Sequence, residues 1–254
     1  MSTLPVTTGT LQAPGAQLYY EVRGTGPLLI LIGNPMDANP FTPLAEVLAT
    51  DHTVVTTDPR GINRSPADDP TQDVAAELRA EDLSRLLAHL ATGPAAVFGS
   101  SGGAVSALAL AVAHPDQHEA AVDDMIATYL RGDIGGAWGR FLADANIVMT
   151  AGDTGPALPP TPDPQAAADE KFFFEHLLRP TTRWKPDLEA LRAGPTRIVV
   201  GIGESSSGQL CDRASTALAA GIGVEPTYFP GGHVGFVENP DAFAARLRVA
   251  LGEA

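Results

Sequence analysis

The sequence has a single cysteine, no surplus of positive charge and no long apolar run, and each absence excludes a class of protein. Because Cys211 is alone, the chain can form no internal disulfide framework and no cysteine metal site. Its 16 basic residues stand against 30 acidic ones, for a formal net charge of −14. This charge argues against nucleic acid and anionic membrane surfaces as partners. We expect a small-molecule substrate instead.

No apolar run approaches the length of a membrane span, and the first residues show no basic region followed by an apolar one. With the lone cysteine, these absences predict a cytoplasmic protein that is neither secreted nor bound to a membrane. At 254 residues, of which 44% are hydrophobic, the chain is long enough for one large α/β domain or for a core with an inserted lid. The sequence leaves the oligomeric state open.

Strand and helix patterns alternate over the first part of the chain. Polar and apolar residues alternate in a predicted hairpin over 9–23, and Leu28–Ile32 is a continuous apolar run, as in a strand buried on both faces of a sheet. The elements expected next are a helix at 41–49, a strand at 53–57, a helix at 74–90 and a strand at 95–98. This alternation predicts a doubly wound, mostly parallel sheet with ligands at the carboxyl ends of its strands.

The alternation breaks after His114. Only the short segment 117–124 stands where another buried strand is expected, so that strand is predicted to be short or missing. We interpret residues 123–185 as a helical lid, inserted into an α/β core made of 1–122 and 186–254. The lid helices are expected at 125–130, 135–148 and 165–178, and the pattern resumes with strands at 196–201 and 225–229 and helices at 209–220 and 240–251.

Aromatic residues are concentrated in the predicted lid. The run Phe172–Phe174 favours a role in the core of the lid over contact with substrate, although a lid allows both. Together with Trp138 and Trp184, this run suggests a mainly apolar substrate.

A serine between two glycines follows the strand at 95–98. The turn Gly99-Ser100-Ser101-Gly102-Gly103 fits the pattern G-x-S-x-G in one register, centred on Ser101, and an apolar helical segment follows it. Glycines at these positions let neighbouring backbone pass close to a serine held in a strained turn. The free N–H groups at the start of the helix would face an oxyanion formed there. Ser101 is therefore the candidate nucleophile.

A serine nucleophile requires a base, and one of the six histidines is placed for that role. His233 follows two glycines in the loop after the last predicted strand, late in the chain. This position matches the order nucleophile, acid, histidine. The other five histidines precede a strand, end helices or lie in or near the predicted lid.

Together these features resemble the α/β-hydrolase fold superfamily over nearly the whole chain. The matching stretches are Leu28–Met36, the turn Asp58–Ser65 (similar to the family's D-x-R-G-x-G-x-S), the elbow around Ser101, and Gly231–Phe236 before the last helix. The resemblance implies that the backbone N–H groups of Asn34 and Gly102 form the oxyanion hole. It also implies a reaction that needs no cofactor and no metal, and serine rather than aspartate at the elbow implies acyl chemistry.

The resemblance places the acid of the triad soon after the strand that ends at Gly201, commonly in a Gly-Glu-x-Asp run, where this chain has Gly203-Glu204-Ser205-Ser206. A serine cannot stabilise an imidazolium by charge. Glu204 is the first candidate for the acid. Asp123 or Asp124, after the preceding strand region, is the alternative placement, and otherwise the enzyme works with a dyad or does not work.

We therefore expect a serine hydrolase that cleaves an ester, thioester or lactone of a mainly apolar small molecule, through an acyl-enzyme on Ser101 with His233 as base. One alternative is a cofactor-free C–C hydrolase or perhydrolase of the same fold. A second alternative is a ligand-binding protein that has lost the acid and with it the activity.

Overall fold

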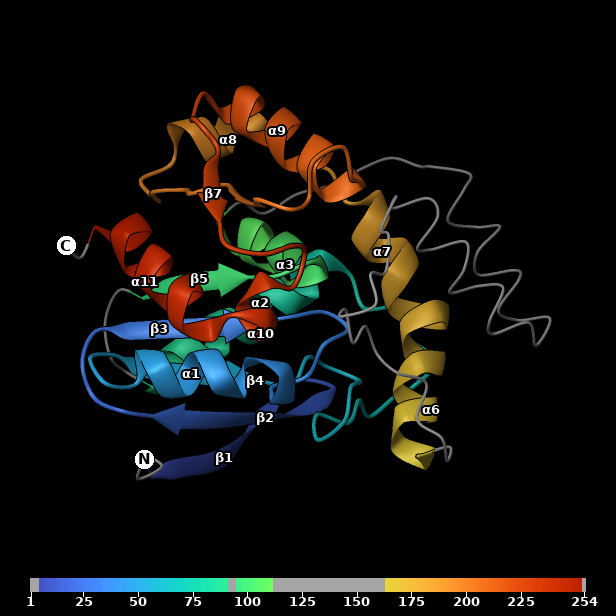
Figure 1. Ribbon diagram of the computed structural model, residues 1–254. Coiled ribbons are helices and arrows are strands. Elements are labelled where there is room, and N and C mark those ends of the chain that lie inside the picture. The colour runs from blue at the N-terminus through green and yellow to red at the C-terminus, as the bar shows by residue number, and fades with distance from the viewer. Residues whose placement is uncertain (1–4, 91–94, 112–162, 253–254) are drawn as a thin grey trace.

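The computed structural model describes residues 5–90, 95–111 and 163–252. Within these ranges the main sheet has five strands in the order β1-β2-β4-β3-β5 (Figure 1). They are β1 (Val6–Ala13), β2 (Ala16–Arg23), β3 (Leu28–Ile32), β4 (Thr53–Thr57) and β5 (Ala96–Gly99). β1 and β2 form the predicted hairpin, β2 pairs antiparallel with β4, and β3 lies parallel between β4 and β5. The carboxyl ends of the three parallel strands therefore meet at one edge.

Helices cover both faces of this sheet (Figure 1). One face carries η1 (Asn39–Phe41), α1 (Thr42–Leu48), α10 (Gly235–Glu238) and α11 (Pro240–Leu251), and the other carries α2 (Ala76–Leu90) and α3 (Gly102–Ala111). Leu29 and Leu31 of β3 pack toward α1 and α11, whereas Ile30 and Ile32 pack toward α2 and α3. Alternate side chains of a strand point to opposite faces, so a strand buried on both sides must be apolar throughout.

The prediction of a strand at 196–201 gives the wrong bounds. The structure has a three-residue strand, β6 (Gly201–Gly203), which pairs in parallel with β7 (Thr227–Phe229) in a separate two-stranded sheet. The apolar run before Gly201 suggested a longer strand. A strand extends only as far as its partner does, however, and β7 begins at Thr227, opposite Gly201.

Two helices cover the small sheet. α9 (Leu210–Ile222) was expected, whereas the six-residue α8 (Leu188–Ala193) was not. Leu191 of α8 packs with Ala219 and Ile222 of α9 and with Val200. Leu108 and Ala111 of α3 also pack against this cluster, and Phe229 of β7 lies in the core of the main sheet, so the small sheet is packed onto the main domain.

The described part of the predicted lid is a column of helix beyond the carboxyl edge of the main sheet (Figure 1). It consists of α6 (Pro164–Phe172), the π-helical segment η2 (Phe173–Leu177) and α7 (Leu178–Arg183). The helices expected at 125–130 and 135–148, and the short segment 117–124, lie outside the described residues. The boundaries of the lid stay a prediction.

The phenylalanines of this column are buried in packing. Phe172–Phe174 form a cluster with Ile62 and Val74, both from the main domain. A hydrogen bond of 2.9 Å, from the backbone N–H of Asn63 to Oδ1 of Asp169, also joins the column to the main domain. The packing supports the interpretation of the aromatic run as lid core, and these three side chains give no ground for an apolar substrate.

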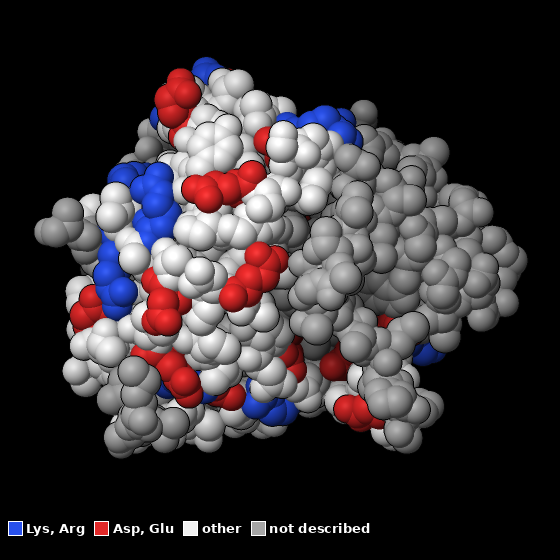
Figure 2. Space-filling model, viewed as in Figure 1, with Lys and Arg blue, Asp and Glu red and all other residues white. Residues whose placement is uncertain are grey.

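The surface charge is dominated by carboxylates. Figure 2 shows acidic side chains dispersed over one face and a group of basic side chains toward its left edge, near α11. Arginines of this region hold elements together: Arg248 pairs with Asp51 at 2.7 Å, and Nε of Arg246 donates to the carbonyl of Tyr228 at 2.8 Å. Among the described residues, no helix has both the length and the apolar character needed to cross a membrane.

The packing of α1 yields a test of the core. Leu48 is fully buried, so Leu48→Ala removes apolar contacts and leaves a cavity. We expect the free energy of unfolding to fall by about 2–5 kcal/mol. The matched control is Leu210→Ala, since Leu210 is 46% exposed and its loss is expected to cost about 0.5 kcal/mol or less. Urea denaturation measures both, and equal losses would contradict the assigned core.

Candidate active site

Ser101 has the strained backbone of a nucleophile elbow. Its φ angle is 55°, in the left-handed region that residues other than glycine seldom adopt. A Cβ at Gly99 would lie 2.5 Å from the carbonyl oxygen of Gly103, and a Cβ at Gly103 would overlap the carbonyl of Ile32. Both glycines are therefore required for β5 to turn into α3, which begins directly after Ser101.

The predicted oxyanion-hole residues lie against each other. A Cβ at Gly102 would be 2.9 Å from the carbonyl oxygen and 3.2 Å from Cβ of Asn34. Gly102 is the first residue of α3, where backbone N–H groups have no partner within the helix. The Asn34 side chain is buried, and neither its Oδ1 nor its Nδ2 has a hydrogen-bond partner among the described residues.

His233 lies in a loop that aromatic packing holds against the elbow strand. Three residues after it, the ring of Phe236 stacks on Phe41 at 4.7 Å and meets Phe98 edge-on at 5.9 Å, measured between ring centroids. Phe98 belongs to β5 and precedes Ser101 by three residues. The structure thus brings the loop of the predicted base to the strand that carries the predicted nucleophile.

Hydrogen bonds from the segment after β6 and from α10 hold the same loop. The N–H of Ser205 donates to the carbonyl of Gly231 at 3.0 Å, and the N–H of Gly232 donates to Oε2 of Glu238 at 3.2 Å. The His233 side chain is half-buried, and this burial lowers its pKa below the ordinary value of 6.5. A neutral imidazole near pH 7 can accept a proton.

The structure does not bring the predicted acid to the base. Glu204 is exposed, and its carboxylate has no hydrogen bond to His233. Ser206, two residues later, is instead the buried member of this loop, with 1% of its surface exposed and its Oγ unpartnered among the described residues. The alternatives Asp123 and Asp124 lie outside the described residues. The acid therefore stays a prediction.

The neighbourhood of the site holds no described metal centre. The described residues contain no group of three or more histidines, cysteines or carboxylates that could hold a metal ion.

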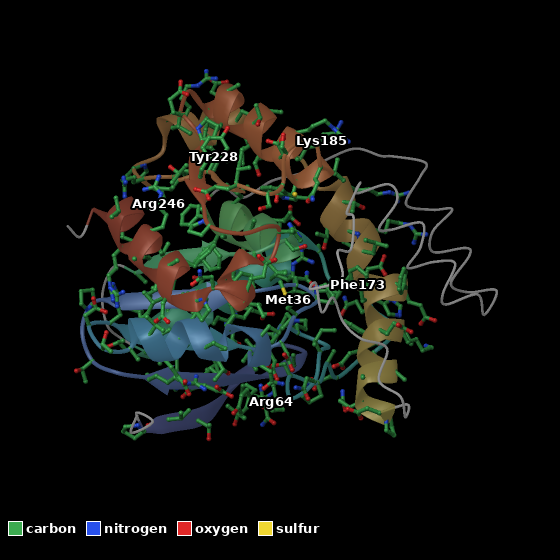
Figure 3. The ribbon with its side chains drawn as sticks, viewed as in Figure 1. Met36, Arg64, Phe173, Lys185, Tyr228 and Arg246 are labelled. Carbon is green, nitrogen blue, oxygen red and sulfur yellow. The ribbon has the colours of Figure 1, made fainter. Side chains whose placement is uncertain are left out.

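Met36, two residues after Asn34, lies between α10 and the column formed by α6 and α7, and Phe173 lies on that column (Figure 3). Met36 packs against the core cluster that contains Phe41 and Phe236.

Comparisons with known proteins agree with this geometry. The model of the alpha/beta hydrolase family matches residues 29–246. This chain is an alpha/beta hydrolase. The hydrolase is 31% identical to YraK of Bacillus subtilis (strain 168), described as an uncharacterized hydrolase, over 98% of this chain and 97% of that protein. It is 28% identical to a zearalenone hydrolase of Bionectria ochroleuca, over 94% and 95% of the two chains.

Solved structures show the same fold. A thermophilic esterase from Thermogutta terrifontis superposes with a TM-score of 0.74 at 21% identity, covering 98% of each chain. Another alpha/beta hydrolase, MGS-M2, from a deep-sea metagenome library, gives a TM-score of 0.76 at 16% identity, covering 97% of this chain and 98% of that one. At such identities the likeness extends to the fold of the hydrolase, and its substrate must be argued from its own residues.

Sequence reasoning missed one charged residue beside the elbow. Arg79 lies on the inner face of α2, with Ala76, Ala80 and Leu83 as buried neighbours on that helix. Its Nε donates to Oγ of Ser106 at 3.0 Å. The helical spacing carried a signal, because an arginine three or four residues from small and apolar inward positions is expected to be buried.

The close approach at the elbow makes its glycines testable. Gly103→Ala should push α3 away from the carbonyl of Ile32, at a cost of about 1–3 kcal/mol in the free energy of unfolding. The matched control is Gly221→Ala, because a Cβ there would meet only the end of the Leu188 side chain. Thermal denaturation of the two variants measures the difference. An unchanged melting temperature for Gly103→Ala would refute the tight contact.

Proposed function

We propose that this hydrolase cleaves a carboxylic ester, thioester or lactone through an acyl-enzyme on Ser101. The observation that carries the proposal is the φ angle of 55° at Ser101, between two glycines that permit no side chain and directly before α3. Such strain at the end of a parallel strand exposes a hydroxyl at the place where ligands bind in this fold. The 28% identical relative named as a zearalenone hydrolase supports hydrolysis as the reaction.

In the proposed reaction Oγ of Ser101 attacks the carbonyl carbon of the substrate, and His233 takes the hydroxyl proton. The N–H groups of Asn34 and Gly102 stabilise the negative charge on the carbonyl oxygen. Collapse of the tetrahedral intermediate breaks the bond to the leaving alcohol, thiol or hydroxyl, which receives the proton from His233. Water then attacks the acyl-enzyme with His233 again as base, so the acid product leaves and the serine is regenerated.

The third member of the triad would have to come from a carboxylate that has no hydrogen bond to His233 among the described residues. Glu204 could approach His233 only if its exposed side chain turned inward, and Asp123 or Asp124 would act from a segment outside the described residues. Without a carboxylate partner, no negative side chain stabilises the imidazolium that His233 forms when it takes the serine proton. A dyad of Ser101 and His233 would therefore turn over more slowly than a full triad.

Labelling by a fluorophosphonate probe tests the nucleophile directly, because the probe modifies activated serines. We expect intact mass and peptide mapping to place the label on Ser101. The label should be lost in Ser101→Ala and strongly reduced in His233→Ala, with circular dichroism showing that both variants are folded. A folded wild-type protein that takes no label would refute an activated serine and favour the ligand-binding alternative.

The pH profile tests the state of His233. Its pKa is lowered by burial, and only the neutral imidazole accepts the serine proton. As the pH decreases, the rate should therefore fall with a midpoint below 6.5, which is a lower pH than for an ordinary histidine. Measuring kcat/KM for an aryl ester from pH 4.5 to 8 gives this midpoint. A midpoint above 6.5 would instead indicate a carboxylate close to the ring.

Ser206 offers a gain-of-function test. Its buried, unpartnered Oγ stands where the resembling family commonly has aspartate, and its loop contacts the loop of His233. In Ser206→Asp a carboxylate should stabilise the imidazolium, so the acidic midpoint should move up in pH and the plateau of kcat/KM should rise at least about tenfold. The control Ser205→Asp alters the exposed neighbour. Equal profiles for the two variants would contradict the placement of Ser206.

A further inference from the structure

Thr181 of α7 lies against the first residue of α3. A Cβ at Gly102 would lie 3.1 Å from Cγ2 of Thr181 and 3.2 Å from Cβ of Asn34. In a helix the free N–H groups of the first turn and the direction of Cβ both point toward the N-terminal end. The methyl group of Thr181 therefore stands at the end of α3 where the candidate nucleophile and the candidate oxyanion donors lie.

A hydrogen bond fixes the direction in which this methyl group points. Nη1 of Arg79 donates to Oγ1 of Thr181 at 2.8 Å. The oxygen and the methyl group are carried by the same Cβ, and a threonine has only a few staggered rotamers. Holding the oxygen toward Arg79 therefore keeps the methyl group against Gly102.

The same guanidinium is linked to Gly102 from the other direction. Nε of Arg79 donates to Oγ of Ser106 at 3.0 Å, and that hydroxyl donates to the carbonyl of Gly102 at 3.3 Å. Arg79 is 4% exposed, its donors form a rigid planar fork, and the carboxylate of Glu77 opposes its charge electrostatically. One buried side chain thus holds both sides of the contact between Gly102 and Thr181.

Further contacts hold the end of α7 in place. Nε1 of Trp184, the residue after α7, donates to Oε1 of Glu77 on α2 at 3.0 Å. The indole also packs against a cluster of small residues from α2 and α3, which comprises Ala76, Ala80 and Ala109. Polar and apolar contacts therefore join α7 to both helices on this face of the main sheet, and Thr181 stands on a wall that is built into the main domain.

This wall lies on the opposite face of the sheet from the loop of the candidate base. α2 and α3 cover one face, whereas α10, which follows His233, covers the other face with α1 and α11 (Figure 1). In acyl transfer the leaving group lies toward the base, because it receives its proton from that base. The acyl chain of a substrate then extends away from His233, toward α7.

We propose that the methyl group of Thr181 forms the wall of the acyl pocket beside the scissile carbonyl, that it restricts branching at the first carbon of the acyl chain, and that Arg79 positions it. This inference rests on the proposed acyl hydrolysis at Ser101. The carbonyl carbon bears both the acyl chain and the oxygen that Gly102 binds, so a group that contacts Gly102 lies beside the start of that chain. The hydrolase therefore prefers esters, thioesters or lactones that are unbranched at this carbon.

Two esters that differ by one methyl group test the restriction. 4-Nitrophenyl propanoate is unbranched, and 4-nitrophenyl 2-methylpropanoate carries one more methyl group on the carbon next to the carbonyl. The quantity to compare is the ratio of kcat/KM for the branched ester to that for the unbranched ester, after subtraction of spontaneous hydrolysis. A ratio cancels any loss of active protein in a variant.

Thr181→Ser keeps the hydroxyl that Arg79 binds and removes only the methyl group. The ratio should rise by about tenfold, since a single methyl or methylene group in a pocket changes discrimination by at least that factor. The matched control is Thr182→Ser, because Thr182 is exposed and its hydroxyl donates to the carbonyl of Leu178 at 2.9 Å. The control should keep the wild-type ratio. An equal ratio in wild type and Thr181→Ser would overturn the proposal.

Arg79→Met tests the positioning role. Without its hydrogen bond Thr181 can turn the methyl group away from Gly102, so the ratio should rise, though less than in Thr181→Ser. In the double variant Arg79→Met should add nothing to the effect of Thr181→Ser. The control is Arg85→Met on the same helix, since Arg85 is exposed and pairs with Glu81. A ratio that Arg79→Met leaves unchanged, or raises equally with and without Thr181→Ser, would refute the positioning role.

A third ester separates the acyl side from the leaving-group side. 2-Methyl-4-nitrophenyl propanoate carries the additional methyl group on the leaving group, and its rate relative to 4-nitrophenyl propanoate should be equal in wild type and Thr181→Ser. A change in this second ratio alone would place Thr181 beside the leaving group and overturn the proposal. Hydrolysis that Ser101→Ala abolishes, with the same acyl preference in wild type and Thr181→Ser, would sustain the acyl hydrolase and overturn only the wall. No hydrolysis by the folded wild-type protein would refute both.

Discussion

The site depends on one backbone contact, between the carbonyl of Ile32 at the end of β3 and Gly103 at the start of α3. No side chain fits at Gly103, so the helix can begin directly above the sheet and Ser101 is forced into a left-handed conformation. The same approach sets Gly102 against Asn34. One close packing of strand and helix thus positions the candidate nucleophile and both candidate donors of the oxyanion hole.

Much of this fold could be predicted from the sequence because the signals are local. The unbroken apolar run of β3 reports burial on both faces, and the glycines around Ser101 report close backbone contacts that the structure then shows. The extent of β6 could not be predicted in this way, since it depends on where β7 begins. A strand's length is a property of the pair, and a single segment does not carry it.

The polar contacts of the site could not be predicted from the sequence. Whether Glu204 or Ser206 faces inward depends on how one short loop sits on another, and the structure buries the serine and exposes the glutamate. The spacing along α2 could suggest that Arg79 lies on the inner face of that helix. Its hydroxyl partners, however, are Ser106 of α3 and Thr181 of α7, which are distant in sequence. Local patterns predict burial, whereas the partners of a buried group follow from the tertiary fold.

The histidine loop and the nucleophile belong to two separately hydrogen-bonded sheets among the described strands. The ring of Phe236, stacked on Phe41 and set edge-on against Phe98, joins them through side chains alone. Such a joint can slide by fractions of an ångström without breaking any backbone hydrogen bond. The spacing between the candidate base and the candidate nucleophile therefore depends in part on these ring contacts, so a substitution of one of the rings would alter that spacing without changing either candidate residue.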